Sequence, residues 1–123
     1  MANVVYVALG GAVGAVGRYL VSLLPAKTVF PVGTLAVNFA GALLIGAVVG
    51  AAEENPALPP GALLFWKTGV CGGFTTFSTF SLEAVQLVEQ GHAALGVCYV
   101  ALSVALCLLG VVLGRAAVLA VRS

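Results

Sequence analysis

Four stretches of this chain are each long and apolar enough to cross a lipid bilayer, and little sequence lies between them. They cover residues 4–24, 32–52, 62–88 and 93–113. Helices of such lengths, at about 1.5 Å per residue, span a hydrocarbon core of about 30 Å. With only 7% charged residues, the chain cannot build a surface that faces water on all sides. The sequence therefore predicts an all-α membrane protein: a single integral membrane domain over residues 1–123, with four transmembrane helices.

Several classes of function are excluded by what the chain lacks. A net charge of +1 leaves no basic surface for nucleic acid. The single histidine and the scattered Cys71, Cys98 and Cys107 form no catalytic set, metal pair or disulfide framework. Because no Lys or Arg precedes the first stretch, we interpret it as a membrane helix rather than a cleaved signal segment. We expect a membrane protein that is not an enzyme.

The positive charges orient the chain only weakly. Arg18 and Lys27 belong to one side of the membrane, and Lys67, Arg115 and Arg122 belong to the other. A split of two against three barely favours either orientation. If both orientations coexist, an antiparallel homodimer would reproduce in two chains the inverted repeat of larger transporters. A fixed orientation with a weak charge signal is the alternative.

The third stretch contains the strongest local signal, a helix break. Gly72 and Gly73 are followed by five hydroxyl side chains and three phenylalanines within residues 74–81, which makes a poor continuous helix. A break at membrane depth frees backbone groups, and helix ends beside it suit ion binding. The hydroxyl residues are Thr75, Thr76, Ser78, Thr79 and Ser81. A kink that serves only packing is the alternative.

Polar and aromatic side chains elsewhere extend this signal. Asn38 lies inside the second stretch, where an amide needs a partner or a function. Phe77 and Phe80 lie on neighbouring parts of one helical face, and the positive edges of their rings attract a small anion. Tyr99 and Ser103 follow each other at a spacing of one helical turn. These groups predict a polar pathway. The alternatives are hydrogen bonding between helices for the polar side chains and core or lipid contact for the phenylalanines.

Charged residues near the ends of the stretches have simpler interpretations. Arg18 lies late in the first stretch, where it anchors the helix at the boundary or gathers anions in a vestibule. Trp66 and Lys67 resemble interface anchors. Glu83 is unexpected beside an anion pathway, because a carboxylate repels an anion unless it is protonated, paired or set aside from the route.

Three motifs together resemble a known family. Gly17-Arg18-Tyr19, the segment GTLAVNFAG at residues 33–41 and the segment GGFTTFSTFSLE at residues 72–83 resemble the fluoride channels called CrcB or Fluc. The resemblance implies a dual-topology antiparallel homodimer in the plasma (inner) membrane, with a sodium ion at its centre. It also implies passive export of fluoride through two pathways, which relieves fluoride toxicity.

The resemblance also implies roles for individual residues. The fluoride pathway would be lined by Asn38, Phe77, Phe80, Tyr99 and Ser103, with Arg18 at the vestibule. Backbone carbonyls of Gly72 and Thr75, from both chains, would hold the sodium ion. Cys107 departs from the family, which often has a hydroxyl there, and a thiol is a weaker donor.

Two other functions remain open from the sequence. A proton-coupled exporter of the small multidrug type needs a carboxylate inside the membrane, but no Asp or Glu precedes Glu53. A non-transporting subunit that assembles other membrane proteins would explain the glycines spaced four apart, but not Asn38 or the hydroxyl-rich break.

Overall fold

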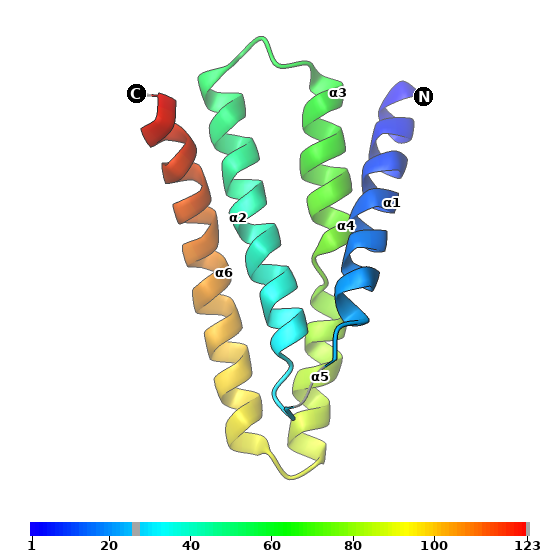
Figure 1. The fold of residues 1–123 in the computed structure, drawn as a ribbon, viewed down its shortest axis with the longest axis vertical. Helices are drawn as coiled ribbons and strands as arrows, with labels where there is room; N and C mark the ends of the chain where they lie inside the picture. The colour runs from blue at the N-terminus through cyan, green and yellow to red at the C-terminus, as the bar shows by residue number, and fades with distance from the viewer. Residues whose placement is uncertain (26–27, 123) are drawn as a thin grey trace.

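The computed structural model describes residues 1–25 and 28–122, so Lys27 of the charge count lies outside it. Three long helices dominate: α1 (Ala2–Ser22), α2 (Val32–Glu54) and α6 (Ala93–Arg122). Between α2 and α6 runs a series of shorter pieces, α3 (Pro60–Leu63), the π-helix η1 (Leu64–Cys71), α4 (Gly72–Phe74) and α5 (Phe77–Glu89). Figure 1 shows these pieces following one another along one line beside α1 and α2. We call residues 60–89 the interrupted segment.

Within the described residues, three helices are long and apolar enough to cross a membrane. They are Ala2–Ser22, Val32–Glu54 and Ala93–Val121. The last helix continues past residue 113, where we expected the fourth stretch to end. It continues because residues 116–121 are apolar and contain no helix breaker. The charge of Arg115 is balanced there by Glu53 of α2, with 2.7 Å between Nη2 and Oε2.

Proline and glycine set the ends of the shorter elements. Pro60 occupies the first turn of α3, where its missing N–H costs nothing. Gly91 has a φ of 85°, a left-handed conformation that glycine adopts readily, and it reverses the chain between α5 and α6. These two helices therefore form a tight antiparallel hairpin at the end of the molecule opposite the termini (Figure 1).

Helix α1 packs against the interrupted segment through glycines on both sides. A Cβ atom on Gly14 would clash with the carbonyl oxygen of Val70, and one on Gly69 would lie 2.7 Å from the Cα of Gly10. Gly73 lies equally close to α1, since its Cβ would clash with backbone atoms of that helix. Small residues let membrane helices approach until their backbones touch. This contact fixes the position of the break relative to α1.

Helices α2 and α6 meet in the same way. A Cβ on Gly46 would clash with the carbonyl oxygen of Val111, and a Cβ on Gly114 would clash with that of Leu43. The glycine pairs of the sequence thus lie at helix contacts. Because α2 and α6 pack closely through these glycines, Asn38 of α2 and Ser103 of α6 line the same cavity.

Adding a methyl group at this contact should destabilise the fold. Gly114→Ala would place its Cβ against Leu43 and 3.1 Å from the backbone nitrogen of Ala47. We expect a loss of about 1–3 kcal/mol, the usual cost of overpacking. Size-exclusion chromatography of heated, detergent-solubilised protein measures the loss. Gly11→Ala is the matched control, because its Cβ would meet nothing within 4 Å; equal melting of the two variants would contradict the prediction.

Candidate functional site

The expected helix break is present in the interrupted segment. Thr75 and Thr76 are extended, with φ and ψ of −83° and 157° and of −147° and 111°, so α4 stops and α5 begins anew. The hydroxyl of Thr76 starts α5 by accepting a hydrogen bond from the backbone N–H of Thr79 at 3.1 Å. Thr75 closes α4, donating its hydroxyl to the carbonyl of Cys71 at 2.9 Å. The hydroxyl-rich sequence thus supplies the caps for both ends of the break.

Asn38 of α2 satisfies the backbone that the break leaves open. Its Oδ1 accepts a hydrogen bond from the N–H of Thr76 at 2.8 Å, and its Nδ2 donates to the carbonyl of the same residue at 3.3 Å. This two-point contact replaces the partners that a continuous helix would provide. An amide carries two N–H groups on its nitrogen, so one donor of Asn38 is left for another acceptor.

Arg18 of α1 meets the break from the other side. Its Nε donates to the carbonyl of Gly73 at 3.2 Å, and the side chain is half-buried. A cation at the last carbonyls of a helix complements their partial negative charge. Among the hydrogen bonds of the described residues at the break, none reaches the carbonyl oxygens of Gly72 or Thr75.

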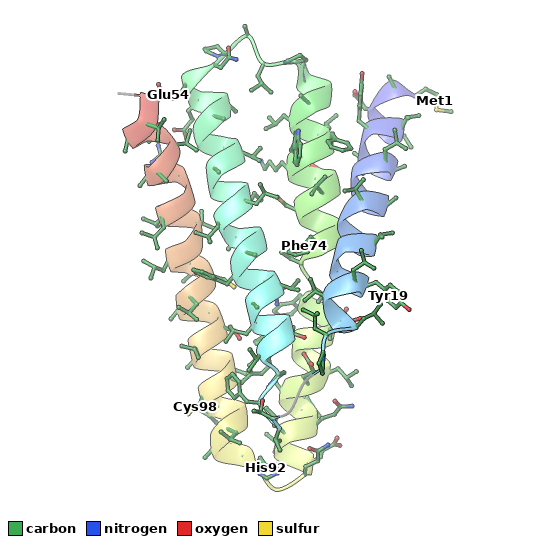
Figure 2. All side chains as sticks on the ribbon, viewed as in Figure 1. Met1, Tyr19, Glu54, Phe74, His92 and Cys98 are labelled. Atoms are coloured by element: carbon green, nitrogen blue, oxygen red, sulfur yellow. The ribbon has the colours of Figure 1, made fainter. Side chains whose placement is uncertain are left out.

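The phenylalanines around the break point in different directions. Phe74 packs between α1 and α2, where it lies close to Gly17 and Gly41, and Figure 2 shows it at the end of α4. Phe77 is 79% exposed, whereas Phe80 is 9% exposed and lies in the core with Leu87. The rings of Phe77 and Phe80 remain adjacent, with centroids 5.6 Å apart. Phe77 therefore presents its ring outward, and the ring of Phe80 lies between it and the rest of the core.

Tyr99 anchors this aromatic group from α6. It is fully buried, and its ring centroid lies 5.1 Å from that of Phe80. Its hydroxyl donates to Oε1 of Glu83 at 3.2 Å. Glu83 thus has a hydrogen-bond partner on the neighbouring helix.

One turn further along α6, Ser103 is buried without a partner. Its side chain is 5% exposed, and its Oγ makes no hydrogen bond within the residues that the structure describes. An unpaired buried hydroxyl is costly, so such a group normally meets water or a ligand. Cys107, another turn on, is half-buried. Cys98 of the same helix is exposed and lies on its outer side (Figure 2).

These groups surround one cavity of about 560 Å³, which we call the break cavity. It lies between α2, the interrupted segment and α6. It is open on one face, where exposed lining residues such as Phe77 and Leu108 lie. Its walls are mostly apolar, with polar and aromatic groups at intervals. Those groups are Asn38, Lys67, Thr68, Cys71, Thr75, Thr76, Phe77, Phe80, Ser103 and Cys107.

The structure brings most of the predicted site residues to this cavity. Tyr99 and Arg18 do not line it: the first lies behind Phe80, and the second lies on the α1 side of the break. Lys67, which we interpreted as an interface anchor, is among the lining residues. Thr76 was expected only as one hydroxyl of five, yet it is the residue on which the contacts from Asn38 and Thr79 converge.

An apolar helical fold with a cavity that carries spaced polar groups beside a broken helix defines a multi-pass membrane protein of the transport class. The CrcB-like protein family, Camphor Resistance (CrcB), matches residues 5–115, and the chain belongs to this family.

Curated relatives are similar over nearly the whole chain. A fluoride-specific ion channel FluC of Ruminiclostridium cellulolyticum is 48% identical, over 94% of this chain and 91% of its own length. A protein of the same name from Cereibacter sphaeroides is 47% identical, over 96% and 95%. One from Agrobacterium fabrum is 46% identical, over 94% and 98%.

Proposed function

We propose that this protein is a fluoride-selective channel that lets fluoride leave the cell passively across the plasma membrane and so relieves fluoride toxicity. One observation carries the proposal: the hydroxyl of Ser103 is buried, has no partner among the described residues and belongs to the wall of the break cavity. The names of the relatives support the choice of ion.

The chemistry of the cavity suits a small anion that must shed water gradually. Asn38 has an amide N–H to spare, Ser103 offers a hydroxyl, and Phe77 and Phe80 offer ring edges. Conduction requires binding that is strong enough for entry and weak enough for release. Neutral donors and ring edges meet that demand because none carries a full charge that would trap the ion. These features favour a channel over an enzyme.

The functional unit is a pair of chains inserted in opposite orientations. The break cavity of one chain is open on one face, so a second copy would be needed to enclose a pathway. The interrupted segment is the fourth crossing in this proposal, since α3 to α5 together cover residues 60–89. The near-even split of positive charges supports insertion in both directions.

A sodium ion at the centre of the pair fits the break. The carbonyl oxygens of Gly72 and Thr75 belong to residues that line the cavity, and no hydrogen bond found at the break among the described residues occupies them. Rings of backbone carbonyls are the ligands that replace the hydration shell of a monovalent cation. Each chain would contribute these two carbonyls, and the ion would fix the two breaks together.

Efflux from liposomes tests the proposal. Purified protein is reconstituted in vesicles loaded with potassium fluoride, valinomycin carries the counterion, and a fluoride electrode records release. We expect rapid fluoride release with no chloride release in matched chloride-loaded vesicles. Release no faster than from protein-free vesicles would overturn the proposal, and proton-driven movement of organic cations would replace it with the exporter alternative.

Cys107 offers a further prediction, because it lines the cavity and is half-buried. A small neutral reagent such as methyl methanethiosulfonate would add a methylthio group there and narrow the pathway. We expect it to slow fluoride release from the unmodified protein but not from Cys107→Ser, in which the remaining thiol of the cavity wall, that of Cys71, is only 3% exposed and shielded from the reagent. Cys107→Ser should conduct at least as well as the unmodified protein, because a hydroxyl is the stronger donor. Cys98→Ser is the control: it should stay sensitive, since Cys98 does not line the cavity. Equal inhibition of both variants would contradict the prediction.

A further inference from the structure

Lys67 is a cation in a cavity that otherwise has neutral walls. Among the described residues that line the break cavity, it is the one with a charged side chain. It is exposed, and the ion pair found among the described residues joins Arg115 to Glu53 instead. No carboxylate therefore faces Lys67 from the walls of the cavity.

Arg18 does not supply this charge. Its guanidinium is held by the carbonyl of Gly73 on the α1 side of the break, and the residue does not line the cavity. Among the described residues that line the cavity of a single chain, the positive charge thus comes from η1 rather than from α1.

The depth of Lys67 makes a purely anchoring role costly. The interrupted segment begins with α3 at Pro60, and Lys67 of η1 lies seven residues further along the chain. At about 1.5 Å per residue, this places Lys67 about 10 Å from the start of the segment. An ionisable side chain at such a depth in a membrane protein usually faces a water-filled cavity and serves a function. Its flexible stem lets the ammonium reach towards the nearer opening of the cavity.

We infer that Lys67 attracts fluoride electrostatically to the end of the break cavity nearest α3. A single positive charge beside low-dielectric walls raises the local concentration of anions and lowers that of cations. The ammonium is compact and strongly hydrated, so it gathers anions without the rigid two-point grip of a guanidinium. Lys67 is a positioning residue: it raises the occupancy of the pathway, and the neutral donors deeper in the cavity carry the dehydration. The inference rests on the proposed function.

The test compares charge variants in the liposome assay at low fluoride. Lys67→Met keeps the stem and removes the charge, and we expect release to slow about threefold to tenfold at low ionic strength. Lys67→Glu should slow it further, and Lys67→Arg should restore it. An inert salt at about 1 M shortens the screening length to about 3 Å, so the deficit of Lys67→Met should shrink towards nothing there.

Arg115→Gln is the matched control, because it removes the same net charge outside the cavity and should leave release unchanged. Unchanged release in Lys67→Met at low ionic strength would overturn the inference while leaving the proposed function intact. So would a deficit that salt does not relieve, because it indicates a structural defect. Failure of the unmodified protein to release fluoride would overturn both.

Discussion

Replacing Phe80 with isoleucine should reduce fluoride release to the level of protein-free liposomes while the protein still folds. Phe80 is 9% exposed, and its ring packs against both Phe77 and Tyr99, so it sets the position of the exposed ring that lines the cavity. Isoleucine keeps most of the buried apolar volume but has no ring edge to offer an anion. We expect a fall of at least about a hundredfold, equivalent to about 2.7 kcal/mol in the barrier. The fluoride electrode measures the release.

Two measurements separate this effect from simple loss of structure. Phe80→Ile should elute as a single species of unchanged size in detergent, because the volume of the core is nearly conserved. Phe74→Ile is the matched aromatic control: Phe74 packs between α1 and α2 and is not part of the cavity wall, so this variant should keep most of the release. Release by Phe80→Ile at the unmodified rate would remove the aromatic ring from the mechanism.

The break could be predicted from the sequence because its signal is local. Adjacent glycines followed by hydroxyl residues disfavour a helix whatever surrounds them, and Thr75 and Thr76 are extended as expected. The long apolar stretches were predictable for the same reason, since length and composition decide whether a helix can cross a membrane. The π-helix at Leu64–Cys71 had no such signal, because its residues form an ordinary helix equally well.

Partners distant in the sequence were mostly missed, although one of them had a usable signal. Glu83 and Tyr99 both lie eight residues from Gly91, the turn of a tight antiparallel hairpin, and residues equidistant from such a turn face each other. The contact of Arg18 with Gly73 had no equivalent signal. It depends on the close approach of two glycine-lined helices, which the spacing of glycines predicts without naming the pairs.

Asn38→Asp should impair fluoride release for two separate physical reasons. An ionised carboxylate can still accept the hydrogen bond from the N–H of Thr76, but it has no donor for the carbonyl of that residue. It also places a negative charge on the wall of the cavity, where it repels the anion. We expect release to fall at least about tenfold at neutral pH, equivalent to about 1.4 kcal/mol in the barrier.

Asn38→Leu separates the two reasons, because it removes both hydrogen bonds and adds no charge. Leaving Thr76 unpaired at the break costs about 1–3 kcal/mol for each buried group, so this variant should melt at a lower temperature than Asn38→Asp. Acid should change release in Asn38→Asp but not in Asn38→Leu. A protonated carboxyl donates one hydrogen bond and accepts another, which restores the contact with Thr76 and removes the charge but leaves no spare donor. Lowering the pH should therefore restore release in part in Asn38→Asp but not in Asn38→Leu. Protein-free vesicles at each pH correct for leakage of neutral hydrogen fluoride. Parallel pH responses in the two variants would contradict a role for the carboxylate charge in the loss of release, and full recovery of Asn38→Asp in acid would show that the spare N–H of Asn38 plays no part in the passage of the ion.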